Sequence, residues 1–188
     1  MPIVTFTTDF GSRDGYAGAM KGVVLSLAPN ATLVDISHGV PPQDVAAGAV
    51  ALTQAAPLFP PGTIHVAVVD PGVGGARADL LVEAGGHFFV GPDNCVLSLV
   101  ARAGRRVFRI EAPAFRREPV SPTFHGRDVF APTAGLLASG ARASDAGPAV
   151  EEMVELTQPV VSRRAGQAEG RVIHVGAFGN LRKTERLF

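Results

Sequence analysis

Residues 3–29, IVTFTTDFGSRDGYAGAMKGVVLSLAP, decide the fold class, because a strand pattern in them runs directly into a helix pattern. Ile3 to Thr8 is a β-branched and aromatic run, which is typical of a buried strand. Over residues 15–28 apolar side chains recur at helical spacing, and Pro29 ends that helix. A strand followed by a helix is the unit from which α/β domains are built.

The same alternation continues to about residue 140. Further strands are predicted over residues 32–36, 64–69, 80–83, 88–90 and 107–110, and further helices over residues 44–58, 96–103 and 130–139. Asp44 is expected to cap its helix, and residues 80–90 are expected to form a hairpin pair. The sequence therefore predicts an α/β domain with a largely parallel central sheet flanked by helices.

The pattern changes after this alternation. Residues 141–170 are rich in Ala, Gly, Pro and Arg with weak periodicity, which is typical of a linker, and a strand is predicted over residues 171–175. We expect an N-terminal α/β catalytic domain over residues 1–155. Residues 156–188 are then expected to hold a linker and the start of a shortened C-terminal β domain, too small to bury a core of its own.

Composition and charge exclude several classes of protein. The formal net charge is zero, with 46% hydrophobic and 18% charged residues, so the chain has no general electrostatic reason to bind nucleic acid or an anionic membrane. The single cysteine, Cys95, cannot form an internal disulfide, which suits a reducing compartment. There is no apolar stretch of roughly 20 residues and no basic N-terminal segment of a signal peptide. We expect a cytoplasmic protein.

Polar side chains follow the predicted strands. They are Asp9, His38, Asp70 and the pair Asp93 and Asn94. In open α/β sheets ligands bind outside the carboxyl ends of the strands, so we expect a site at this edge. A carboxylate at Asp9 is suited to accept hydrogen bonds from a vicinal diol, whereas His38 is expected to hold the proline turn that follows it. Asp14 is expected to cap the first helix.

The turn DPGVGGAR places Arg77 seven residues after Asp70. Two interpretations remain open: an ion pair that braces the turn, or an arginine that orients a reacting group against Asp70. The turn lacks the lysine and the following Ser/Thr of a P-loop, so phosphate binding is not expected.

Residues 123–132, TFHGRDVFAP, precede and open a predicted helix. His125 lies beside Gly126, and structural and catalytic roles for it are equally compatible with the local sequence. Asp128 is expected to cap the helix and Arg127 to serve as an ion-pair partner. Elsewhere no Cys/His set has the spacing of a zinc site, so no metal is expected.

In this order, these stretches resemble one family, the S-adenosyl-L-methionine (SAM) hydrolases, also called SAM hydroxide adenosyltransferases, which are related to the fluorinases and chlorinases. The matching stretches span residues 8 to 180 and are TDFGSRDGYAGAMKGV, VDISHGVPPQDVAAGA, FPPGTIHVAVVDPGVGGAR, FVGPDN, TFHGRDVFAP and FGN. The resemblance implies hydrolysis of SAM to adenosine and L-methionine, by attack of water or hydroxide on C5′ of the ribose. It implies no cofactor.

The resemblance also implies roles for single residues. It assigns the nucleophilic water to Asp70, Arg77 and His125, and an aspartate at position 70 favours hydrolysis over halogenation. The implied substrate contacts are Asp9 for the ribose hydroxyls, Phe124 and Gly126 beside SAM, and Phe178 and Asn180 for the adenine.

Three features depart from the family pattern. Gly176 stands where an aspartate usually contacts the methionine amino group, and Lys183 and Thr184 stand where a Thr-Asn pair is usual. The family's C-terminal β-barrel also runs on for many tens of residues beyond the equivalent of Phe188. The resemblance implies a homotrimer, with the site between one subunit's N-terminal domain and a neighbour's C-terminal domain.

These departures leave alternatives open. One is a truncated homologue that binds SAM or adenosine without turning it over. The others are a SAM-dependent halogenase, against which Asp70 counts, and a metal-dependent hydrolase that uses Asp9, Asp70 and His125.

Overall fold

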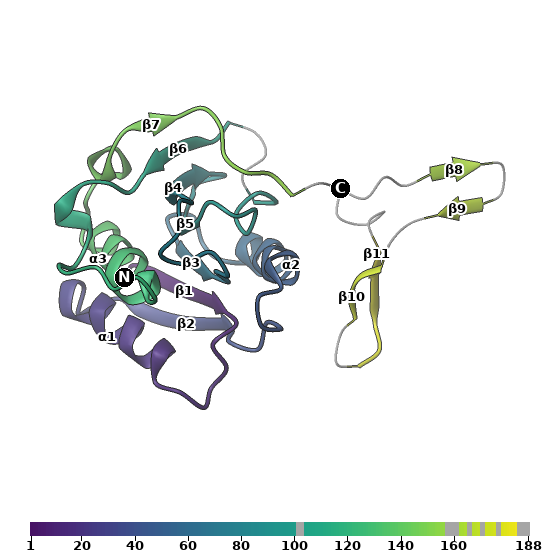
Figure 1. Cartoon of the computed structure of the whole chain (residues 1–188), viewed down its shortest axis with the longest axis horizontal. Helices are drawn as coiled ribbons and strands as arrows, with labels where there is room; N and C mark the ends of the chain where they lie inside the picture. Colours follow the sequence, from purple (N-terminus) through teal and green to yellow (C-terminus); the bar gives the residue numbers. More distant parts are fainter. Residues whose placement is uncertain (101–103, 157–161, 165–166, 170–171, 176–177, 184–188) are drawn as a thin grey trace. The chain divides into compact units, whose positions relative to one another are not determined.

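The computed structural model describes residues 1–100, 104–156, 162–164, 167–169, 172–175 and 178–183 (Figure 1). The chain divides into two compact units, Met1–Glu155 and Leu156–Phe188.

The first unit follows the predicted alternation closely. Its strands are β1 (Ile3–Thr8), β2 (Thr32–Ser37), β3 (Ile64–Val68), β4 (Asp79–Ala84), β5 (His87–Pro92), β6 (Arg106–Arg109) and β7 (Ala149–Val150). Its α-helices are α1 (Tyr16–Leu27), α2 (Val45–Ala55) and α3 (Ala131–Ala138). Short helical turns are η1 (Ala56–Leu58), η2 (Pro113–Phe115), the π-helical turn η3 (Gly126–Phe130) and η4 (Ala143–Ala146).

The strands form one seven-stranded sheet in the order β2-β1-β3-β5-β4-β6-β7. The pairs β2–β1, β1–β3 and β3–β5 are parallel, and the remaining three pairs are antiparallel. The predicted α/β class is confirmed, but the sheet is mixed rather than largely parallel. The direction reverses at the predicted β4–β5 hairpin, whose turn residues Gly85 and Gly86 have φ angles of 58° and 81°. Such a pair of positive φ values matches the right-handed twist of the strands.

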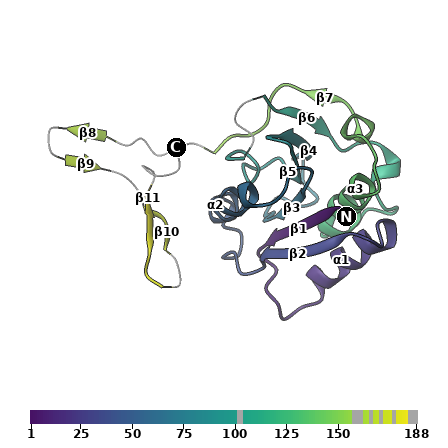
Figure 2. The ribbon, with the colours of Figure 1, turned by 180° about the vertical axis from the view of Figure 1, so that it is seen from behind.

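Helices cover both faces of the sheet, α1 and α3 on one side and α2 on the other (Figures 1 and 2). A separate apolar core fills each interface. On the first face, Phe6 of β1 packs in one cluster with Met20 of α1 and Phe130 of η3. On the second face, Leu52 of α2 shares a cluster with Val82 of β4.

Two predictions at element boundaries are wrong. Residues 96–100 form turns rather than the start of a helix over 96–103, and residues 101–103 lie outside the described part of the chain. Cys95 has a φ of 81°, which is incompatible with a helical entry, and its carbonyl accepts hydrogen bonds from the backbone and hydroxyl of Ser98. Asp14 does not cap α1, because the cap position is Gly15. Asp44 caps α2 as predicted, accepting a hydrogen bond from Ala47 N at 2.9 Å.

Asp128 is not the cap of the helix that follows TFHG. The helical turn η3 begins one residue after His125, so Asp128 lies inside it and is 1% exposed. Its carboxylate accepts two hydrogen bonds from the predicted partner Arg127 and one from Ser121 N, at 2.7 to 2.9 Å. Burial acts to raise the pKa of Asp128, but these hydrogen bonds outweigh burial and lower it. Asp128 therefore anchors the chain at Ser121 to the helical turn.

The predicted linker over residues 141–170 is wrong for its first half. Residues 143–146 form η4, β7 pairs with β6, and Ala143, Ala146 and Met153 are buried in the first unit. Small apolar side chains without periodicity resemble a linker in sequence, yet they suit close packing.

Among the described residues of the second unit there are two short antiparallel pairs. Strand β8 (Ser162–Arg164) pairs with β9 (Gln167–Glu169), and β10 (Val172–Val175) pairs with β11 (Leu181–Lys183). The strand predicted over 171–175 corresponds to β10, while Arg171, Gly176 and Thr184 lie outside the described residues. In the part of the chain that the structure describes, no helix is long and apolar enough to cross a membrane.

Candidate active site

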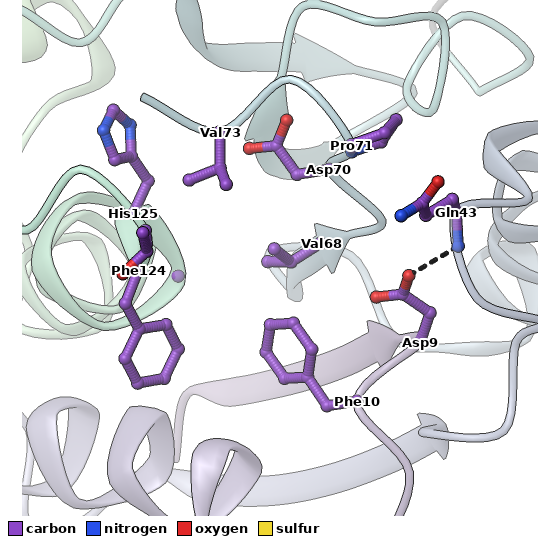
Figure 3. A pocket seen from close by; sticks show the side chains of 11 residues that line it. Asp9, Phe10, Gln43, Val68, Asp70, Pro71, Val73, Phe124 and His125 are labelled. Carbon is purple, nitrogen blue, oxygen red and sulfur yellow. Dashed lines mark hydrogen bonds between the residues drawn. The ribbon is translucent and has the colours of Figure 1, made fainter. Parts of the chain in front are cut away.

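Two adjacent parallel strands, β1 and β3, end at the same edge of the sheet, where Thr8 is in register with Val68. Asp9 directly follows the first strand, and Asp70 follows the second by two residues. A cavity of about 290 Å³ opens at this edge. Its lining comprises Asp9, Phe10, Gln43, Val68, Asp70, Pro71, Val73, Thr123, Phe124, His125 and Gly126. Asp9 and Gln43 lie on the side opposite Phe124 and His125 (Figure 3).

Arg77 clamps the carboxylate of Asp70 in a bidentate ion pair. Its Nε donates to Oδ1 at 3.0 Å, and its Nη2 donates to Oδ2 at 2.5 Å. Burial acts to lower the pKa of Arg77, but the hydrogen bond to Asp70 and the charges of Asp79 and Asp70 raise it above its ordinary value. Asp70 lines the cavity, whereas Arg77 is absent from the lining residues. The ion pair therefore braces the turn and also fixes a carboxylate at the cavity wall. The geometry agrees in part with both interpretations of the sequence, the structural ion pair and the arginine that orients a reacting group against Asp70.

His125, the residue directly before η3, joins this cluster. Its Nδ1 lies 3.1 Å from Arg77 Nη2 and 3.0 Å from Asp79 Oδ1, and its side chain is 14% exposed. The structure thus brings together Asp70, Arg77 and His125, the three residues to which the resemblance assigns the nucleophilic water.

Asp79 is a member of the cluster that the sequence reasoning missed. Its side chain is 7% exposed and contacts Arg77 Nη1 and His125 Nδ1, with Arg116 Nη2 at 3.8 Å. It opens β4, which runs antiparallel to β5, so the start of this strand reaches the edge where the parallel strands end. One signal was present in the sequence: a carboxylate beginning the apolar run DLLV is costly to bury unless it is paired.

Asp9 is held by the loop before α2. Its Oδ2 accepts a hydrogen bond from Gln43 N at 2.8 Å, and Gln43 adopts a φ of 64°. This bond uses one of the two carboxylate oxygens and fixes the side chain at the cavity. The arrangement is suited to a ligand that offers hydroxyl donors.

Aromatic rings form another wall of the cavity. Phe124 meets Phe10 and Tyr16 edge to face, with ring centroids 6.0 and 5.1 Å apart, and the Arg127 guanidinium lies 5.2 Å from its ring centroid. Space beside this ring is tight at Gly126, because a Cβ there would lie 3.2 Å from Phe124 Cε2 and 3.0 Å from Met20 Sδ, and these side chains would have to move by a few tenths of an ångström.

Three of the polar residues predicted near strand ends are not brought to the cavity. Asp93 accepts a hydrogen bond from Val154 N at 2.7 Å, and Asn94 donates to Val69 O at 2.8 Å. These contacts brace the chain beside Asp70 rather than line the site. His38 lies 2.8 Å from Thr8 Oγ1 and 3.0 Å from Asp35 Oδ1, so its ring links the ends of β1 and β2, and its role in the proline turn stays a prediction.

The remaining predicted contacts, Phe178 and Asn180, lie in the exposed turn between β10 and β11 of the second unit, where Phe178 is 96% exposed. Among the described residues, no group of three or more His, Cys, Asp or Glu side chains is arranged to hold a metal ion.

The α/β sheet, the cavity at the strand ends and the buried carboxylate–guanidinium–imidazole cluster are typical of α/β enzymes that act on small molecules. Residues 4–147 match the SAM hydroxide adenosyltransferase N-terminal domain, and the chain belongs to this family.

Relatives of known name agree with this assignment. The chain is 45% identical over 185 residues to the (R)-S-adenosyl-L-methionine hydrolase of Salinispora arenicola, covering 96% of this chain and 70% of the relative. It is 38% identical over 190 residues to the protein of that name from Methanocaldococcus jannaschii, covering 96% and 66%. A fluorinase from an Actinoplanes species is 26% identical over 209 residues, covering 96% and 70%.

A solved structure shows the same fold. The crystal structure of an uncharacterized conserved protein from Thermotoga maritima matches with a TM-score of 0.90 and 33% sequence identity, covering 97% of this chain and 70% of that one.

Proposed function

We propose that this protein hydrolyses SAM to adenosine and L-methionine by in-line attack of water or hydroxide on C5′ of the ribose. The observation that carries the proposal is the cluster at the cavity wall, where Arg77 clamps Asp70 and contacts His125. Family membership and the names of relatives that are 38% and 45% identical support it.

The main task of the protein in this reaction is to position the attacking water. The electron pair of the C5′–S bond passes to a positively charged sulfur, which leaves as a neutral thioether, so the leaving group needs no proton. One water has to be held in line with that bond, and placement of this kind can supply roughly 7–11 kcal/mol in favourable cases. The proton lost by the water passes to a carboxylate or imidazole acceptor, the roles proposed for Asp70 and His125. The bidentate ion pair with Arg77 fixes the orientation of the Asp70 carboxylate.

Substrate contacts follow from the lining of the cavity. We propose that Asp9 accepts hydrogen bonds from the ribose hydroxyls and that Phe124 and Gly126 contact SAM near the reacting carbon. The cavity, at about 290 Å³, lies at the lower limit of small-molecule sites, which span roughly 300–1,000 Å³. It suits the ribose and the reacting centre rather than the whole substrate. Contacts from Phe178 and Asn180 to the adenine are proposed from the resemblance.

Three further proposals rest on the resemblance and on chemistry. The reaction is proposed to need no cofactor or metal, because the sulfonium is already activated as a leaving group, so activity is expected to survive EDTA. The protein is proposed to be a homotrimer, for which light scattering would give three times the chain mass of 19.4 kDa. A cytoplasmic location is proposed from the single cysteine.

Direct product analysis tests the function. Purified protein is incubated with SAM, and adenosine and methionine are separated by chromatography. We expect both products in equal amounts, with at least a 100-fold lower rate in His125→Ala. A matched control is His87→Ala, which removes a histidine from the start of β5, away from the cavity.

One result of this assay would contradict the proposed function. Wild-type protein that forms no more adenosine than His125→Ala would contradict the proposal. Calorimetry with adenosine would then decide whether the chain is a homologue that binds without turnover.

A further inference from the structure

Asp79 has the contacts of a residue that acts on the reaction through others. It contacts Arg77, His125 and, at 3.8 Å, Arg116, yet it is absent from the residues that line the cavity, whereas Asp70 and His125 are present. Any effect of Asp79 on turnover has to pass through its neighbours.

The position of His125 Nδ1 limits where its proton can be. This atom lies 3.0 Å from an acceptor, Asp79 Oδ1, and 3.1 Å from a donor, Arg77 Nη2. A neutral imidazole nitrogen either donates or accepts, so only one of these contacts is a hydrogen bond.

The partners of Arg77 favour the contact with Asp79. Its Nε and Nη2 already donate to Asp70, and its Nη1 donates to Asp79, so the guanidinium does not depend on His125. An unprotonated Nδ1 would instead place its lone pair against a buried carboxylate oxygen at 3.0 Å. A hydrogen bond from Nδ1–H to this carboxylate is charge-assisted and therefore stronger than a neutral one.

We propose that Asp79 is a positioning residue for the proposed SAM hydrolysis, on which this inference rests. Its Oδ1 accepts from both His125 Nδ1 and Arg77 Nη1. The first bond fixes the imidazole with its proton on Nδ1 and Nε2 unprotonated, and it sets the ring orientation. The second holds the guanidinium with its other two nitrogens turned to Asp70.

The charge of Asp79 also affects the geometry of the Asp70–Arg77 ion pair. Two carboxylates, Asp70 and Asp79, face two guanidiniums, Arg77 and Arg116, within the cluster. Replacement of Asp79 by a neutral side chain leaves Arg77 with Asp70 as its one carboxylate partner among the described contacts, and the Asp70–Arg77 geometry is then free to shift.

The kinetic test uses Asp79→Asn, which keeps the shape and removes the charge. An asparagine amide can donate to Nδ1 and so favour the other tautomer. We expect kcat to fall on the order of 10- to 100-fold while KM for SAM changes by less than about threefold. Glu83→Gln is the matched control, because Glu83 lies on the same strand and pairs with Arg106, and its kcat is expected to equal that of wild type. Circular dichroism establishes that each variant is folded at the assay temperature.

A spectroscopic test reads the tautomer of His125 in wild-type protein, with a folded His125→Gln variant used only for assignment. The ¹⁵N shifts of the imidazoles in wild-type protein, recorded at about pH 8 where imidazoles are ordinarily neutral, report which nitrogen carries the proton. The His125 signals are assigned from their loss in His125→Gln. We expect a protonated Nδ1 and an unprotonated Nε2.

Two results would overturn the inference: an Nε2–H tautomer of His125 in wild-type protein, or an unchanged kcat in folded Asp79→Asn. Failure of the proposed function gives a different result, namely no adenosine from wild type, and the NMR measurement then still decides the tautomer.

Discussion

A single backbone hydrogen bond prepares Asp9 for its proposed role. The bond from Gln43 N fixes one carboxylate oxygen at 2.8 Å, and the carboxylate lies across the cavity from Phe124 (Figure 3). A hydrogen bond between a ligand and a charged group contributes about 1.5–3 kcal/mol. Binding of the ribose is therefore expected to depend on Asp9 more than the chemical step does.

Asp9→Asn tests this at the residue scale. The amide retains an acceptor oxygen but not the charge, so KM for SAM is expected to rise about 10- to 100-fold, with a smaller change in kcat. Steady-state kinetics and calorimetry with adenosine measure the effect. Asp44→Asn is the control, since this neighbouring residue caps α2 and asparagine caps a helix about as well as aspartate, so neither stability nor KM is expected to change appreciably. An equal rise of KM in both variants would contradict the assignment.

The sequence predicts the place of a single side chain correctly where that residue directly follows a buried strand, because the strand fixes the direction of the chain. Asp9 and Asp70 were found because each follows a β-branched run that ends at the carboxyl edge. Asp93 and Asn94 were misplaced, because the direction of a side chain in a tight turn depends on its local hydrogen bonds. Asp79 was missed because the predicted strand began only at residue 80, and because its contact with His125 joins segments far apart in the sequence.

At the scale of elements, the glycine-rich turn after β3 interlocks with the segment that leads to η3. Gly74 has a φ of 73°, and a Cβ at this position would overlap the carbonyl oxygen of Pro122. The close approach of these two backbones is what places Arg77, beyond the turn, beside His125. The turn was recognised in sequence as rich in glycine, but its partner segment lies some 48 positions further along and has no local signature.

Gly74→Ala is predicted to be costly for two separate reasons. A left-handed backbone costs an alanine about 1–2 kcal/mol, and the overlap with Pro122 adds a further 1–3 kcal/mol, so the free energy of unfolding is expected to fall by roughly 2–5 kcal/mol. Urea denaturation measures the change. Gly62→Ala is the matched control, with a φ of 84° and nothing within 4 Å of the new Cβ. Its expected loss is confined to about 1–2 kcal/mol. Equal losses in the two variants would show that the turn and the Pro122 segment are not interlocked.

At the scale of the whole molecule, periodicity was enough to predict the α/β class but not the sheet. The order β2-β1-β3-β5-β4-β6-β7 depends on pairings between strands far apart in sequence. The reversal at the β4–β5 hairpin makes half of the sheet antiparallel, and β7 completes it from a stretch that has no strand signature. Local propensity cannot encode such long-range choices.

His65 lies on β3, an interior strand of this sheet, and its protonation affects the stability of the whole unit. The ring is 0% exposed, with Nδ1 2.8 Å from Thr5 Oγ1 and Nε2 3.4 Å from His87 Nδ1. It stacks on Phe89, with centroids 5.0 Å apart. Burial, together with the charge of His87, lowers the pKa of His65 from 6.5 to about 4. The folded state therefore keeps this imidazole neutral at a pH where the unfolded chain would protonate it.

The unfolding free energy is predicted to depend on pH through this group. Between pH 6.5 and about 4 the unfolded state binds more protons than the folded state, so stability rises with pH over this window. The contribution of His65 is complete above about pH 6.5 and is lost as the pH falls to about 4, a loss of about 3 kcal/mol. Urea denaturation at intervals between pH 7.5 and 4 measures the slope.

His65→Gln separates this effect from other titrations. The variant loses absolute stability because it leaves a gap against Phe89, but its stability is expected to vary less with pH over the same window. The pKa values of Asp35, Asp128 and Asp145 are lowered from 3.8, so these carboxylates act below the window and in both proteins. An identical slope in the variant and in wild type would place the acid sensitivity elsewhere in the molecule. Burial also lowers the pKa of His87, which titrates in the same window in both proteins, so a flatter slope in the variant would show the part of the acid sensitivity that His65 supplies.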